Sequence, residues 1–286
     1  MVQNDIQDYI LSEYSEFLEF IPLHFELSEQ EEYIKNLIET FNINYHYEKY
    51  ESAFFNLHIL YMIAVYSYIL KLKNNDLEDF YMSLISLDKS EVKKYQNKFK
   101  NKKIKLFDFS MFKENNVFSF FESLGFSEQD LKLISESVQK RNVYAHPRGR
   151  IIVKNSVELN DLIQKNVQAL EKIHSEIKTK ICNLFIDFID KNFDDFEDEL
   201  KEIENLNQKV EEEQDDDQKK LLKMDLDKTI QLIKEKIRDF FIQENYLNKR
   251  DVNECLQINF EEHIKLARFE EKKKLFNQFR IIFSEE

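Results

Sequence analysis

Apolar residues recur every three to four positions through most of this 286-residue chain, and that spacing is typical of amphipathic α-helices. Pro22 ends the first such pattern, and Ser28 to Glu31 has the form of a capping box that begins the second. In the first hundred residues the predicted helices span 5–21, 28–41, 46–73, 77–87 and 91–100. The pattern therefore predicts a succession of helices joined by short loops.

The same periodicity continues in the rest of the chain. Gly125 sits where a helix C-cap is needed, and Ser127 to Asp130 can begin the next helix. Pro147 ends that helix, because the residue before a proline is disfavoured in the α region. The further predicted helices span 128–146, 156–190 and 258–283, with a coiled-coil-like apolar seam over 226–240. The predicted fold class is all-α.

One predicted helix is apolar on nearly every side. From Ser52 to Leu70 the chain has no Asp, Glu, Lys or Arg, and a run of that length could cross a bilayer. Asn56, His58, Ser67 and three tyrosines interrupt it, and a lipid-facing helix would be penalised for them. We therefore expect a central helix buried in the core and no membrane partner, with a membrane-associated effector as the alternative.

Composition narrows the possible functions. Glycine and proline occur twice each, so a glycine-rich nucleotide-binding loop is not expected. The two cysteines, Cys182 and Cys255, are too few for a disulfide framework or a cysteine zinc site. No export signal is visible, so a cytoplasmic location is expected. We expect the protein to use neither a metal nor a cofactor. The net charge of −14 disfavours a general nucleic-acid coat, which leaves local basic patches to consider.

The residues with the clearest chemical meaning are Arg141, Asn142 and His146, at the end of the predicted helix 128–146. Asn142 and His146 are four apart, so they share a helix face and can form a hydrogen bond. A histidine near neutral pKa can move the proton of a ribose 2′-OH or of a leaving 5′-oxygen. An arginine can hold a phosphate through a forked pair of hydrogen bonds and stabilise its developing charge. These three are the candidate catalytic residues for cleavage of a phosphodiester.

Basic residues surround this motif in an otherwise acidic protein. From Ser137 to Val157 there is no acidic residue, and three of the seven arginines fall within ten positions. Arginine is a better fork for phosphate than lysine is, so a polyanion should bind at this turn. An incidental Arg and His in a structural helix is the alternative. The candidate RNA-binding residues are Lys140, Arg148, Arg150 and Lys154.

The stretch Arg141-Asn142-Val143-Tyr144-Ala145-His146 resembles the motif of the HEPN superfamily, small helical bundles whose nucleases carry Arg, four to six residues, then His. Asn commonly follows the Arg in that family, as Asn142 does here. The resemblance covers residues 46–190 and implies a metal-independent endoribonuclease that leaves 2′,3′-cyclic phosphate and 5′-hydroxyl ends. It implies that Arg141 binds phosphate, that His146 acts as acid or base, and that Asn142 orients His146.

The resemblance also implies a homodimer in which two motifs meet to form one site. Family members serve as toxins of toxin–antitoxin pairs, as abortive-infection proteins and as CRISPR-associated effectors, so an antitoxin or defence-system protein is an expected partner besides RNA. One toxin branch carries a tyrosine two residues after the histidine, and a partner nucleotidyltransferase modifies it. Arg148 stands there in this chain, which argues against that mode of neutralisation.

Charge patterning suggests how the chain is divided. Between Asp187 and Asp217 there are fifteen acidic residues and three lysines, as in a solvated helix followed by a flexible loop near 211–217. An autoinhibitory mimic of RNA is the alternative for this segment. The lysine-rich segment 89–105 either guides RNA or is an ordinary solvated helix. The predicted parts are N-terminal helices over 1–45, the HEPN-like bundle over 46–190, and an acidic linker with C-terminal helices over 191–286.

Two other functions stay open beside the ribonuclease. A non-catalytic HEPN-like module would bind RNA or a nucleotide at the same basic turn without cutting it. A helical interaction protein would instead use the apolar seam of its C-terminal part to bind partners. Four histidines have no evident partner in the sequence and are expected to be structural: His24, His46, His58 and His174.

Overall fold

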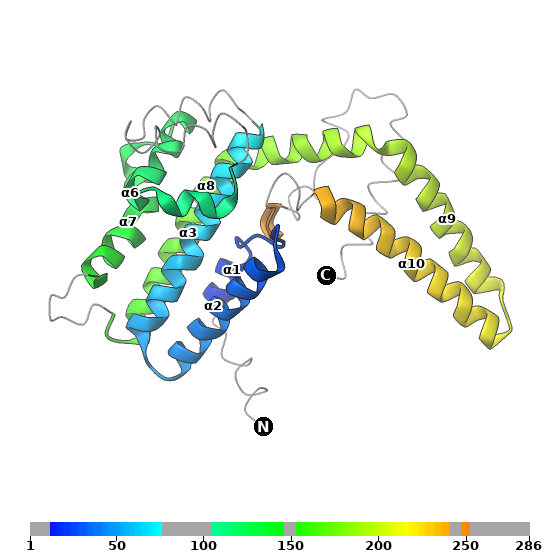
Figure 1. Ribbon diagram of the computed structural model, residues 1–286, viewed down its shortest axis with the longest axis horizontal. Helices are drawn as coiled ribbons and strands as arrows, with labels where there is room; N and C mark the ends of the chain where they lie inside the picture. The colour runs from blue at the N-terminus through cyan, green and yellow to red at the C-terminus, as the bar shows by residue number, and fades with distance from the viewer. Residues whose placement is uncertain (1–11, 76–103, 146–152, 241–246, 252–286) are drawn as a thin grey trace. The chain divides into compact units, whose positions relative to one another are not determined.

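The computed structural model describes residues 12–75, 104–145, 153–240 and 247–251 (Figure 1). Within these ranges most residues are helical, and the extended pairing consists of one isolated bridge between Pro22 and Asn248. The protein is therefore all-α, as predicted. The predicted helices over 77–87, 91–100 and 258–283 lie outside the described residues.

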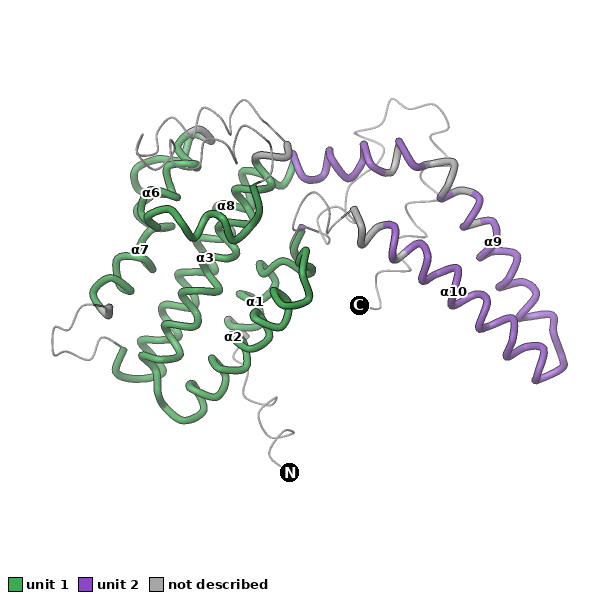
Figure 2. Tube along the Cα trace, viewed as in Figure 1, with its two compact units in different colours: residues 1–179, 245–250 green, residues 180–244, 251–286 purple. Residues whose placement is uncertain are grey.

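The chain forms two compact units, which divide within one helix (Figure 2). The first comprises residues 1–179 and 245–250, and the second comprises 180–244 and 251–286. Among the described residues, the helices of the first unit are α1 (Ser12–Leu18), α2 (Ser28–His46), α3 (Tyr50–Asn75), the short helices η2 (Leu106–Met111), α6 (Glu114–Val117) and η3 (Phe118–Leu124), α7 (Glu128–Ala145), and α8 (Ser156–Lys191) as far as residue 179.

Helix α3 provides much of the core of the first unit. It packs against α2, η2 and α7. The Tyr61 hydroxyl donates a hydrogen bond to the Ile134 carbonyl of α7 at 2.5 Å, and the Tyr68 hydroxyl lies 3.3 Å from Nδ1 of His174 on α8. The stretch 50–72 is long and apolar enough to cross a membrane, but 83% of its most apolar window is buried inside the protein. Such burial is what the sequence predicts for a core helix.

The predicted caps set the ends of the helices that carry the motif. Gly125 ends η3 in the left-handed region, with φ of 79°, which glycine adopts without steric cost. Ser127 Oγ accepts a hydrogen bond from the Asp130 amide, while Asp130 Oδ2 accepts one from the Ser127 amide. This reciprocal capping box begins α7 at Glu128, as predicted. Asn155 Oδ1 caps α8 in the same way, by accepting from the Glu158 amide at 2.9 Å.

The boundary between α2 and α3 differs from the prediction. Helix α2 continues past Phe41 to His46, and α3 begins at Tyr50 rather than at 46. The chain turns at Glu48, whose φ is 55° although it is not a glycine. Helix α2 begins at Ser28, as predicted, but Leu27 occupies the N-cap position and offers no side-chain hydrogen bond. The capping box predicted at Ser28 is therefore wrong.

A short segment distant in sequence packs beside α1. The Leu23 amide donates a hydrogen bond to the Leu247 carbonyl at 3.0 Å, across the bridge between Pro22 and Asn248. Arg250 pairs with Glu16 at 2.7 Å and with Glu19 at 3.0 Å. Residues 247–250 thus belong to the first unit, although the sequence predicts them to be part of a C-terminal extension.

The second unit contains a helical hairpin. Helix α9 (Phe193–Glu212) and helix α10 (Asp216–Phe240) run side by side (Figure 1) and bury Phe196, Ile203, Leu206 and Ile233. The Lys236 ammonium donates to the Glu199 carboxylate at 2.6 Å. The loop predicted over 211–217 is only three residues long, because Glu211 and Glu212 continue α9 and Asp215 caps α10 through the Gln218 amide at 2.9 Å.

Candidate functional site

Arg141 lies near the C-terminal end of α7, and its side chain is 24% exposed. One guanidinium nitrogen, Nη2, forms an ion pair with the carboxylate of Glu114, the first residue of α6. The Nε atom lies 3.4 Å from Nε2 of His58, which comes from α3. Three helices therefore converge on the guanidinium, which is held in place and still reaches the surface.

His58 links this ion pair to the core. Its side chain is only 2% exposed, with Nε2 3.1 Å from Glu114 Oε2 and Nδ1 3.3 Å from Ser137 Oγ. A carboxylate only accepts hydrogen bonds, so the contact with Glu114 requires a proton on Nε2. In that tautomer Nδ1 accepts from the Ser137 hydroxyl. The alternative tautomer would let Nε2 accept from Arg141 Nε, but at the longer distance of 3.4 Å. The shorter contact favours His58 as a donor to Glu114.

Opposing influences act on the pKa of Glu114. Partial burial raises it, but hydrogen bonds and charge interactions with His58 and Arg141 lower it by more, so the net pKa lies below the usual value. Glu114 is therefore ionised in the folded protein over the physiological range. The buried imidazole and the partly buried guanidinium depend on this carboxylate as a shared partner.

We expect Glu114→Gln to destabilise the protein at neutral pH and to make its free energy of unfolding less dependent on pH in the acid range. A carboxylate whose pKa is depressed by folding contributes stability above its unfolded pKa, roughly 4.3 for glutamate, and loses that contribution as the pH falls through the folded value. The gap in the free energy of unfolding between wild type and variant should shrink as the pH falls below about 4. Denaturant unfolding of both proteins at several pH values measures this difference in free energy. Glu122→Gln, at an exposed position of η3, controls for the loss of one acidic charge. A gap that stays constant with pH would contradict the assignment.

The other candidate residues are only partly within the described structure. Lys140 and Asn142 are half-buried on α7, and the Lys140 ammonium lies 3.5 Å from the Glu136 carboxylate. Lys154 is exposed just before α8. His146, Arg148 and Arg150 lie outside the described residues, so the predicted pairing of Asn142 with His146 stays a prediction. The structure joins Arg141 to two residues that the sequence did not assign to the site.

His58 and Glu114 are those two residues. His58 has no evident partner in the sequence and is expected to be structural, but in the structure it contacts Ser137, Glu114 and Arg141. A signal was present, since His58 interrupts the stretch 52–70, which has no charged residue, and a buried imidazole needs a hydrogen-bonding partner. Glu114 carries no such signal, because it lies among other polar residues between aromatic ones and its role depends on the packing of α6 against α7.

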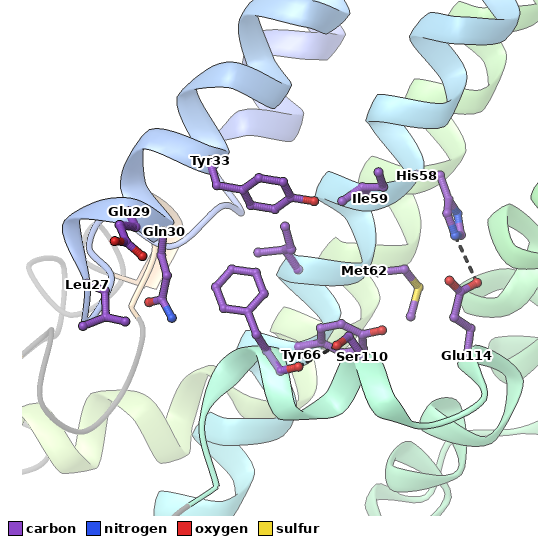
Figure 3. A pocket seen from close by; sticks show the side chains of 12 residues that line it. Leu27, Glu29, Gln30, Tyr33, His58, Ile59, Met62, Tyr66, Ser110 and Glu114 are labelled. Atoms are coloured by element: carbon purple, nitrogen blue, oxygen red, sulfur yellow. Dashed lines mark hydrogen bonds and ion pairs between the residues drawn. The ribbon is translucent and has the colours of Figure 1, made fainter.

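A cavity of about 590 Å³ opens beside this cluster, and His58 and Glu114 form one end of it. In Figure 3 Gln30 and Tyr33 reach into the cavity from α2, on the side away from Glu114. Tyr66 of α3 and Phe107 of η2 also line it. Burial raises the pKa of Tyr66, the Glu114 charge raises it further, and the Arg141 charge lowers it. The phenol of Tyr66 is therefore close enough to the ion pair for both of its charges to affect the pKa of Tyr66.

Within the described ranges, no three His, Cys, Asp or Glu side chains group closely enough to hold a metal ion. The chemistry available to the described cluster is that of a guanidinium, a carboxylate and an imidazole. No family model matches the chain, and neither a curated protein nor a solved structure matches it significantly.

Proposed function

We propose that the protein is a metal-independent endoribonuclease of the HEPN type, with Arg141 and His146 as its catalytic residues. The observation that carries the proposal is the partly exposed guanidinium of Arg141, five positions before His146 and held by Glu114, whose carboxylate also contacts the buried His58. A guanidinium oriented by surrounding side chains can bind a phosphate without reorganising first. The basic turn that follows in the sequence would bring the RNA backbone to it.

In the proposed reaction the ribose 2′-oxygen attacks the adjacent phosphorus. A base removes the 2′-OH proton as the bond from phosphorus to the 2′-oxygen forms. The bond from phosphorus to the 5′-oxygen breaks, and that oxygen takes up a proton, which leaves a 2′,3′-cyclic phosphate and a 5′-hydroxyl. His146 supplies one of these proton transfers, oriented by Asn142, and Arg141 stabilises the charge on the phosphoryl oxygens. Lys140, Arg148, Arg150 and Lys154 bind the flanking phosphates.

A homodimer that brings two such motifs together is part of the proposal, as is a role as a toxin or antiviral effector whose partner restrains it. A non-catalytic module that binds RNA or a nucleotide is the second candidate. One observation favours that candidate: Glu114 already occupies one nitrogen of the Arg141 guanidinium, so an incoming phosphate must compete with a carboxylate.

Digestion of RNA in EDTA separates these functions. Wild type should cut single-stranded RNA in the chelator, and His146→Ala should reduce the rate by about 10²-fold or more, because a positioned acid or base contributes about 10²–10⁴-fold. His46→Ala replaces an exposed histidine at the end of α2 and should cut at the wild-type rate. Intact RNA with salt-sensitive binding would support the second candidate. Neither binding nor cutting would leave only a helical interaction protein.

A further inference from the structure

We propose that the cavity beside Glu114 binds a nucleobase, preferentially adenine, of the nucleotide whose phosphate contacts Arg141. The inference rests on the proposed function and names part of its substrate. The cavity lies between α2, α3 and η2 (Figure 3), and its 590 Å³ falls within the range of small-molecule sites, roughly 300–1,000 Å³. It is therefore large enough for a purine and its ribose.

Aromatic rings line this cavity and provide flat apolar surfaces. The rings of Tyr33 and Phe107 lie edge to face with centroids 6.2 Å apart. Tyr33 is 43% exposed, so its ring is accessible to a ligand in the cavity. Bases stack on aromatic side chains through their π-faces, so this wall suits a nucleobase.

A polar group on α2 is placed to recognise the edge of a base. Gln30 lines the cavity, and its buried Oε1 atom has no hydrogen-bond partner among the described residues. A buried acceptor without a donor destabilises the unliganded protein, and a donor from a ligand would satisfy it. The amide of glutamine pairs with the N6 amino group and N7 of adenine through two hydrogen bonds. Gln30 therefore favours adenine over uracil, which offers no exocyclic amino group.

The charge of the cavity sets the orientation of the nucleotide. Glu29 and Glu114 line it, and no Lys or Arg is among the described residues that do. A phosphate would be repelled from this interior, whereas the amino group of a base can donate to a carboxylate. Arg141 is not among the residues that line the cavity, but it pairs with Glu114, which does. A nucleotide can thus place its base in the cavity and its phosphate at Arg141.

Binding of adenosine in EDTA, measured by titration calorimetry, tests the inference without any cleavage step. Gln30→Ala and Tyr33→Ala should each weaken adenosine binding about tenfold or more, whereas Tyr33→Phe should retain it because the ring remains. Uridine should bind wild type at least about tenfold more weakly than adenosine. Tyr47→Ala, at another exposed tyrosine at the end of α2, and Gln168→Ala, at an exposed position of α8, are matched controls that should bind like wild type. Unchanged melting temperatures would show that the variants fold.

Each result separates the two proposals. If wild type cuts RNA but does not bind adenosine, or if Gln30→Ala and Tyr33→Ala bind adenosine as tightly as wild type does, the base site is wrong and the ribonuclease stands. If adenosine binds in a way that depends on Gln30 and Tyr33 but RNA stays intact, the base site stands and the ribonuclease is wrong. If wild type neither binds adenosine nor cuts RNA, both are wrong.

Discussion

Replacing Arg141 with alanine should lower the rate of RNA cleavage by about 10³-fold, because it removes a preorganised donor to the phosphoryl oxygens. The guanidinium is held by Glu114, which His58 in turn contacts, so its orientation does not have to be established during the reaction. Arg141→Lys keeps the positive charge but loses the fork, and we expect it to recover only part of the activity. Single-turnover cleavage of a labelled oligonucleotide measures the chemical step directly.

The control for this variant is a neighbouring cation on the same helix. Lys132 is exposed on α7, and Lys132→Ala should leave the single-turnover rate within about twofold of wild type. Arg141→Ala also leaves Glu114 and His58 without one partner, so its helix content and melting temperature must be compared with those of wild type. A folded Arg141→Ala protein that cuts RNA at the wild-type rate would contradict the role given to Arg141.

Phe109→Ala should lower the free energy of unfolding by about 3–5 kcal/mol, because it removes a fully buried ring and leaves a cavity. Phe109 is 0% exposed, and its ring contacts those of Tyr66, Phe112 and Phe120 at centroid distances of 5.9, 6.3 and 5.9 Å. These contacts join η2 and η3 to α3. Equilibrium unfolding in urea, followed by circular dichroism, measures the loss.

Met111 provides the comparison for Phe109 within the same short turn. Its side chain is 49% exposed, so Met111→Ala should change the free energy of unfolding by about 0.5 kcal/mol or less. Tyr66 links Phe109 to the cavity, and Phe109→Ala should therefore weaken adenosine binding as well. Equal stabilities for the two variants would mean that the aromatic segment is not part of the core.

The sequence predicts helices best where their ends carry chemical signals. Ser127 and Asp130 begin α7, Gly125 ends the preceding turn, and Asn155 begins α8, each through hydrogen bonds available to its residue type. The turn between α2 and α3 carries no such signal, because the residue with positive φ there is Glu48 rather than glycine. The boundary was consequently misplaced.

The candidate site is less predictable because its parts come from distant segments. Arg141 was identified from its spacing to His146 and its basic neighbours, all local in sequence. His58 and Glu114 are 83 and 27 positions earlier, and only the packing of α3 and α6 against α7 brings them to the guanidinium. A single sequence does not reveal such pairings, although the lone histidine in an uncharged stretch indicates that some polar partner is needed.

The central claim is that Arg141 and His146 act on a phosphate next to a ribose 2′-OH. An oligonucleotide of deoxynucleotides with one internal ribonucleotide, incubated with wild type in EDTA, tests this most directly, because the nucleophile is present at one position alone. We predict a single cut on the 3′ side of the ribonucleotide, which leaves a 2′,3′-cyclic phosphate on one product and a 5′-hydroxyl on the other. Cutting at deoxynucleotides would contradict the claim. The claim would also be contradicted if the mixed strand stayed intact while all-ribose RNA was cut to products with other end groups.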